Sequence, residues 1–124
     1  MTTLTEHHIS AALSAGRHVE QFLRPRTDDG QTIIRWLDLS VRKDGYTVIL
    51  YEVFDNGSPD YLDVYSFGEV EPDDEPPRHS FPSLDEALAF AVTAYNAPRN
   101  NYVSQGVIQD DYAAYLAATR GPGR

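Results

Sequence analysis

Residues 46–70 constrain the fold of this 124-residue chain most strongly. They hold two runs of β-branched and aromatic side chains, 46–54 and 61–70, separated by the turn-forming residues 55–60. β-Branched and aromatic residues fit a pleated, half-buried surface, whereas Asp, Asn, Gly and Pro interrupt strands. We therefore expect two strands here. The register of the second stays open, because a shift of one residue would exchange its two faces.

Another strand is expected immediately upstream, at about residues 32–42. It joins the 46–54 strand through Asp44 and Gly45, a typical two-residue hairpin turn. With that turn, Val41 pairs with Val48 and Leu39 with Leu50, and Glu52 lies opposite Leu37. The four paired aliphatic residues then share one face, which we interpret as the core face. A charged Glu52 is expected at the end of the sheet, where it reaches solvent or Arg35.

The opposite face of this hairpin carries Trp36, Ile49, Tyr51 and Val53. These side chains are too apolar for an ordinary solvated face. We expect this second sheet face to be covered by another part of the chain, by a second subunit or by a partner.

Helices are expected at 6–23, 83–97 and 110–119, where apolar residues recur at helical spacing. Ser83 and Glu86 form a capping box at the start of the second of these helices. The acidic, proline-rich residues 71–77 predict an exposed loop. A fourth strand near 78–81 or 102–108 is left open.

The expected fold is one α+β domain over residues 1–124, with frayed ends at 1–4 and 120–124. A three- or four-stranded antiparallel sheet has helices mainly on one face, in the order α-β-β-β-α-α. Over residues 6–96 this order resembles that of double-stranded RNA-binding domains. Such domains bind RNA through basic residues at the start of the final helix, where this chain has Ser83, Asp85 and Glu86. The resemblance therefore does not imply RNA binding.

The formal net charge of -9 is unevenly distributed. Residues 1–50 hold six basic and six acidic residues, whereas residues 51–124 hold four basic and thirteen acidic ones. Such a field repels nucleic acid and attracts cationic partners. Cysteine is absent, which excludes disulfides and suits a cytoplasmic location. We see no export signal at the N-terminus and no apolar run long enough to span a membrane.

Candidate motifs for chemistry are weak. His7, His8 and His18 lack the spacing of metal ligands on a helix, and residues 55–63 do not match a calcium-binding loop. Neither Ser66 nor Ser80 has the sequence context of a nucleophile, and no phosphate-binding motif occurs. We expect no cofactor, no metal and no catalytic residue.

The sequence therefore favours a non-catalytic, acidic protein that binds a protein partner, which we expect to be basic. In general character it resembles bacterial immunity and antitoxin-like inhibitors. Two alternatives stay open: a small enzyme or ligand-binding protein with a pocket between the sheet and residues 99–106, and a homodimer formed through the second sheet face. The predicted interaction residues are aromatic, apolar or acidic: Trp36, Tyr51, Val53, Tyr61, Tyr65, Asp73, Asp74 and Glu75.

Overall fold

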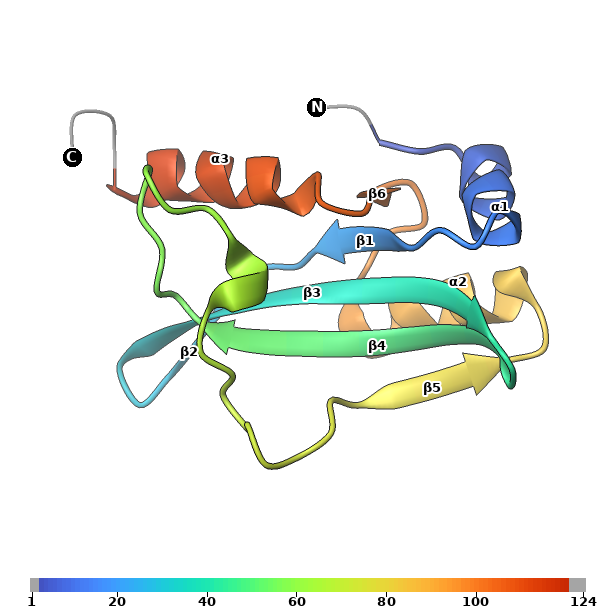
Figure 1. The fold of residues 1–124 in the computed structure, drawn as a ribbon, viewed down its shortest axis with the longest axis horizontal. Helices are drawn as coiled ribbons and strands as arrows, with labels where there is room; N and C mark the ends of the chain where they lie inside the picture. Colours follow the sequence, from blue (N-terminus) through green and yellow to red (C-terminus); the bar gives the residue numbers. More distant parts are fainter. Residues whose placement is uncertain (1–2, 121–124) are drawn as a thin grey trace.

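The computed structural model describes residues 3–120. Its elements are, in chain order, α1 (Glu6–Ser14), β1 (Val19–Phe22), β2 (Arg26–Asp28), β3 (Gln31–Arg42), β4 (Gly45–Phe54), the 3₁₀ turn η1 (Val64–Ser66), β5 (Arg78–Phe81), α2 (Leu84–Tyr95), β6 (Val103–Ser104) and α3 (Ile108–Arg120). The strands are antiparallel and ordered β5-β4-β3-β1-β6, with β2 paired to β3 outside this path (Figure 1). The α+β class is confirmed. The smaller sheet and the order shared with double-stranded RNA-binding domains are wrong.

The β3–β4 hairpin is present, but its register differs from the expected one by two residues. Arg42 pairs with Gly45, so Lys43 and Asp44 form the turn. Neither residue has the positive φ that a type I′ turn needs. The residue with positive φ at this turn is Gly45, at 115°. A shift of two residues leaves every side chain on its expected face. It does move Glu52, which lies opposite Arg35 instead of Leu37.

Residues 15–23 are not helical, so the expected helix over 6–23 is wrong beyond Ser14. Gly16 has a φ of 79° and ends the helix, as left-handed glycines commonly do. The chain then enters β1, where Val19 points to one side of the sheet and Glu20 to the other. The apolar spacing predicted a helix because Val19 and Leu23 are four residues apart, a separation that fits one face of a helix and also one face of a strand.

Residues 26–30, for which the sequence predicts a loop ahead of the 32–42 strand, are regular instead. Residues 26–28 form β2, and Asp29 and Gly30 connect it to β3 with φ values of 52° and 78°. Positive φ at both positions is the conformation that a type I′ hairpin turn needs. The Asp-Gly signal for such a turn therefore applies here and not at Asp44 and Gly45.

The expected strand over 61–70 is wrong. The segment is irregular apart from η1, and isolated bridges join Glu69 to Val53 and Tyr61 to Ser58. Val64 and Phe67 are both buried in a cluster with the second sheet face. Their three-residue spacing suits a turn of 3₁₀ helix, whereas in a strand residues three apart would point to opposite sides.

Both faces of the sheet are covered: two of the three described helices pack on one face, as predicted, and the third packs on the other. α1 and α2 pack on Leu37, Leu39, Val48 and Leu50. α3 and the segment with η1 pack on the other side in a second core (Figure 1). The second core contains Ile34, Trp36, Val53, Val64, Phe67, Val103, Ile108, Tyr112 and Leu116. Part of the chain itself therefore covers the second sheet face.

The remaining elements agree better with the sequence. The Ser83 side chain accepts a hydrogen bond from the Glu86 amide, which confirms the helix start. Strands exist at both alternative positions, as β5 and β6. Of the predicted frayed ends, residues 1–2 and 121–124 lie outside the described residues. The Leu4 amide donates a hydrogen bond to the carbonyl of Tyr102 (2.8 Å). Within residues 3–120, the helices are too short or too polar to cross a bilayer.

The turn at Gly45 gives a test of the hairpin. A Cβ on this residue would collide with the carbonyl oxygen of Phe81 in β5, and the positive φ adds strain. Gly30 has a similar φ but open space around it. We expect Gly30→Ala to cost about 1 to 2 kcal/mol of unfolding free energy from strain alone. Gly45→Ala should cost clearly more, as measured by urea denaturation. Equal losses would contradict the packing of β5 against the turn.

Candidate functional site

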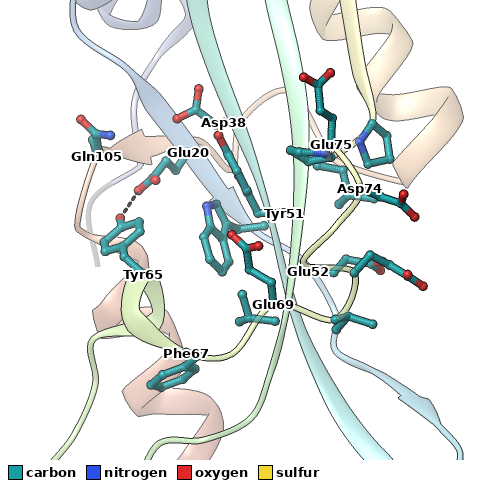
Figure 2. Close-up of a pocket in the computed structure, with 17 residues that line it drawn as sticks. Glu20, Asp38, Tyr51, Glu52, Tyr65, Phe67, Glu69, Asp74, Glu75 and Gln105 are labelled. Carbon is teal, nitrogen blue, oxygen red and sulfur yellow. Dashed lines mark hydrogen bonds between the residues drawn. The ribbon is translucent and has the colours of Figure 1, made fainter.

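A cleft of about 560 Å³ opens on the second sheet face, beside the part covered by α3. Its floor comes from β1, β3 and β4, and its walls come from residues 65–77 and from Gln105 in the loop between β6 and α3 (Figure 2). The lining residues are Glu20, Trp36, Asp38, Leu50, Tyr51, Glu52, Val53, Tyr65, Phe67, Glu69, Val70, Glu71, Asp74, Glu75, Pro76, Pro77 and Gln105.

Three aromatic rings form one side of the cleft. Trp36 and Tyr51 are cross-strand partners in β3 and β4, and their rings stack at a centroid distance of 5.5 Å. The ring of Tyr65 from η1 meets Trp36 edge to face at 5.6 Å. Trp36 is only 3% exposed, whereas Tyr65 is 43% exposed and Tyr51 is half-buried. The accessible ring surface therefore belongs to the two tyrosines, and Trp36 holds them in place.

Glu20 places a carboxylate at the base of the cleft, although its residue is 1% exposed. The hydroxyl of Tyr65 donates to its Oε1 atom at 2.6 Å (Figure 2). The backbone amide of Gly106 donates to the same atom at 2.9 Å. Burial raises the pKa of Glu20, and the nearby Asp38 adds to this, while the two hydrogen bonds and the more distant His18 act in the opposite direction. Burial also raises the pKa of Tyr65, and its hydrogen bond to Glu20 reinforces that shift.

Asp38 lies next to Glu20, because the two are direct partners across β3 and β1. Like charges at opposed positions of a sheet repel each other. Asp38 has a partner in His18, whose Nδ1 lies 2.9 and 3.0 Å from the two carboxylate oxygens. An ionised carboxylate only accepts, so Nδ1 carries a proton in this contact.

The acidic rim of the cleft is held in place by the backbone of β4. The Gly68 carbonyl accepts from the amide of Phe54 (2.8 Å), and the Pro77 carbonyl accepts from the amide of Leu50 (3.0 Å). The segment between these two anchors is exposed, as expected for residues 71–77. It places four carboxylates around the entrance: Glu69, Glu71, Asp74 and Glu75.

The residues that line the cleft include no Lys, Arg or His. Glu52 also lines the cleft, but it forms ion pairs with Arg26 (2.8 Å) and Arg35 (2.9 Å), which are not part of the lining. The hydrogen bond from Arg26 is the main reason that the pKa of Glu52 is lowered. Over residues 3–120, no three His, Asp or Glu side chains are grouped closely enough to hold a metal ion. The arrangement therefore offers aromatic rings and negative charge to a ligand.

Most of the predicted interaction residues meet at this cleft. Six of the eight line it: Trp36, Tyr51, Val53, Tyr65, Asp74 and Glu75. The other two, Tyr61 and Asp73, are not part of the lining. Tyr61 packs on Phe67, and its hydroxyl contacts that of Ser66. Asp73 is exposed on the acidic loop. Trp36 and Val53 belong to the second core as well, so they support the fold and the cleft together.

Sequence reasoning missed Glu20, Asp38, Glu69, Glu71 and Gln105. Glu20 was hidden by the helix assigned to its segment. Asp38 did carry a signal, because the hairpin pattern places its charge directly beside Trp36 on the second sheet face. The rim residues Glu69 and Glu71 depend on the path of an irregular segment, which no local pattern predicts.

Comparison with known proteins adds no identification: no family model, no curated protein and no solved structure matches this chain.

Burial of Glu20 predicts how stability depends on pH. Its pKa in the folded protein is raised above the ordinary value of 4.5. The stabilising contribution of the protonated form is therefore complete below about pH 4.5 and is lost as the pH rises through the folded pKa. Glu20→Gln keeps the Oε1 acceptor and removes the charge. Between pH 4.5 and about pH 7, its unfolding free energy should gain relative to wild type.

Urea denaturation of both proteins at a series of pH values measures this difference. Glu69→Gln is the matched control, because it makes the same chemical change at an exposed position on the rim. The control should follow the wild-type pH profile. A Glu20→Gln profile parallel to wild type would show that Glu20 is not desolvated in the folded protein.

Proposed function

We propose that this chain is a non-catalytic interaction protein that binds a basic protein partner through the acidic, aromatic cleft. One observation carries the proposal: besides Glu52, which is paired with two arginines, six carboxylates line the cleft around accessible tyrosine rings, and no basic side chain lines it. These six are Glu20, Asp38, Glu69, Glu71, Asp74 and Glu75. Tyrosines and tryptophans are common anchors of protein interfaces, and a negative field accelerates association with a cationic surface.

The chemistry of the lining supports binding over catalysis. The hydroxyl of Tyr65 donates its hydrogen bond to Glu20, which keeps the tyrosine protonated, and the pKa of Tyr65 is raised. A tyrosine in that state is a poor nucleophile or base. Small acidic inhibitors of basic enzymes, including immunity and antitoxin-like proteins, bind in this general way, and we propose a role of that kind in the cytoplasm.

A ligand-binding protein is the second candidate. The cleft adjoins Gln105 and the amide of Gly106, close to the 99–106 segment expected to border a pocket. Its volume falls within the range of about 300 to 1,000 Å³ that is typical of small-molecule sites. A homodimer through this face is less favourable, because a twofold interface would bring two copies of the same acidic surface together.

The proposal is tested by removing charge from the rim. The variant with Glu69→Gln, Asp74→Asn and Glu75→Gln lowers the negative charge by three at exposed positions. Immobilised protein is used to capture partners from lysate of the source cell. If each exposed ion pair contributes about 0.5 kcal/mol, the triple variant should bind a captured basic partner about tenfold more weakly. Binding should also weaken with added salt.

The matched control makes three similar changes away from the cleft: Asp29→Asn, Asp60→Asn and Asp110→Asn. It has the same net charge as the rim variant. The control should retain most of the wild-type affinity. Equal losses in both variants would mean that net charge alone attracts the partner, and an unchanged affinity in the rim variant would contradict the proposal.

A further inference from the structure

Glu20 stands apart from the other acidic residues that are sheltered from solvent. Asp38 contacts His18 at 2.9 Å, and Glu52 contacts Arg26 and Arg35. Glu20 is more deeply buried than Glu52, yet its two hydrogen-bond donors are neutral, a phenol and a backbone amide. Among residues 3–120, no basic group lies within ion-pair distance of it. Buried carboxylates are normally paired with a cation.

The two oxygens of the Glu20 carboxylate differ in their contacts. Both donors bind Oε1, and the structure gives Oε2 no hydrogen bond. Within the described chain, the Tyr102 hydroxyl is the one side-chain nitrogen or oxygen that is both fully buried and without a hydrogen bond. Oε2 therefore keeps some accessible surface. Because Glu20 lines the cleft, that surface lies at the base of the cleft.

We propose, on the basis of the function proposed above, that the cleft receives the guanidinium group of an arginine side chain on the partner, with Glu20 as its counterion. The cation would complete the pairing that Glu20 lacks within its own chain. The neighbouring carboxylate of Asp38 adds negative charge beside the same position, and the rim acids draw a basic surface towards the entrance.

The aromatic rings select a guanidinium over other cations. Tyr51 and Tyr65 offer accessible ring surface, and Trp36 fixes their positions from below. A planar guanidinium stacks on such rings and is weakly hydrated, whereas an ammonium is compact and strongly hydrated. A metal ion fits less well, since the described residues provide no group of three suitable ligands.

The test uses short peptides that differ at one residue. Acetylated, amidated Gly-Ser-X-Ser-Gly is prepared with arginine, lysine or citrulline at X; citrulline keeps the shape of arginine but has no charge. Each is titrated into the ¹⁵N-labelled protein at low salt. The indole N–H of Trp36, the one tryptophan in the chain, reports occupancy of the cleft by NMR. The arginine peptide should shift this resonance saturably and bind about tenfold or more tightly than the citrulline peptide.

Two variants link this binding to the cleft. Glu20→Gln should weaken the arginine peptide about tenfold or more, while Asp60→Asn, which lies outside the cleft, should bind it as wild type does. Tyr51→Leu removes a ring without touching the buried carboxylate and should also weaken binding. It serves as the second test if Glu20→Gln does not fold, as judged by its NMR spectrum.

Several outcomes would overturn the assignment. These are equal affinity for arginine and citrulline peptides, preference for lysine, wild-type affinity in Glu20→Gln, or saturable binding of Ca²⁺ at the same resonance. If free arginine binds much more tightly than the arginine peptide, the cleft is a site for a small metabolite instead of a protein partner. If partner capture depends on the rim acids but not on Glu20, the proposed function stands and this inference fails. If it depends on neither, the proposed function itself fails.

Discussion

The pairing of β3 with β4 is the constraint on which the rest of the structure depends. Ten residue pairs join the two strands, from Ile33 with Phe54 to Arg42 with Gly45. Their alternation assigns Leu37 and Leu39 to the core under α1 and α2, and it assigns Trp36 and Asp38 to the opposite face. The cleft exists because α3 and the irregular segment 55–70 cover that second face only in part, leaving its aromatic and acidic residues accessible.

The cleft combines groups that oppose each other energetically. Burial of Glu20 next to Asp38 disfavours the charged form, and two hydrogen bonds offset only part of that cost. The Trp36, Tyr51 and Tyr65 rings pack against one another beside Glu20 on the same side of the sheet. Natural proteins retain such unfavourable arrangements most often at functional sites. For this reason we propose Glu20 as the residue that binds a cation in the cleft. A bound cation would relieve the repulsion between the two carboxylates.

The sequence predicted those features that local patterns determine. The two long strands, their faces and the capping box at Ser83 follow from alternation and cap chemistry. It failed where two patterns coincide: the apolar spacing around Val19 fits a helix or a strand, and that ambiguity concealed Glu20. It also failed for residues 61–70, where aromatic content suggested a strand but tertiary packing of Val64 and Phe67 produces a 3₁₀ turn. The aromatic half of the cleft was therefore predictable, and most of its acidic half was not.

The central claim is that a desolvated carboxylate without an ion-pair partner, Glu20, lies at the base of the cleft. A pH titration followed by carboxyl ¹³C NMR measures the ionisation of Glu20 and tests this claim directly. The titration is read with and without saturating arginine peptide, and Asp38, His18 and Tyr65 are the titratable neighbours to be resolved beside it. We expect Glu20 to titrate above its ordinary value of 4.5 in the unbound protein and at lower pH when the peptide is bound. Titration at the ordinary value, unchanged by the peptide, would contradict the account.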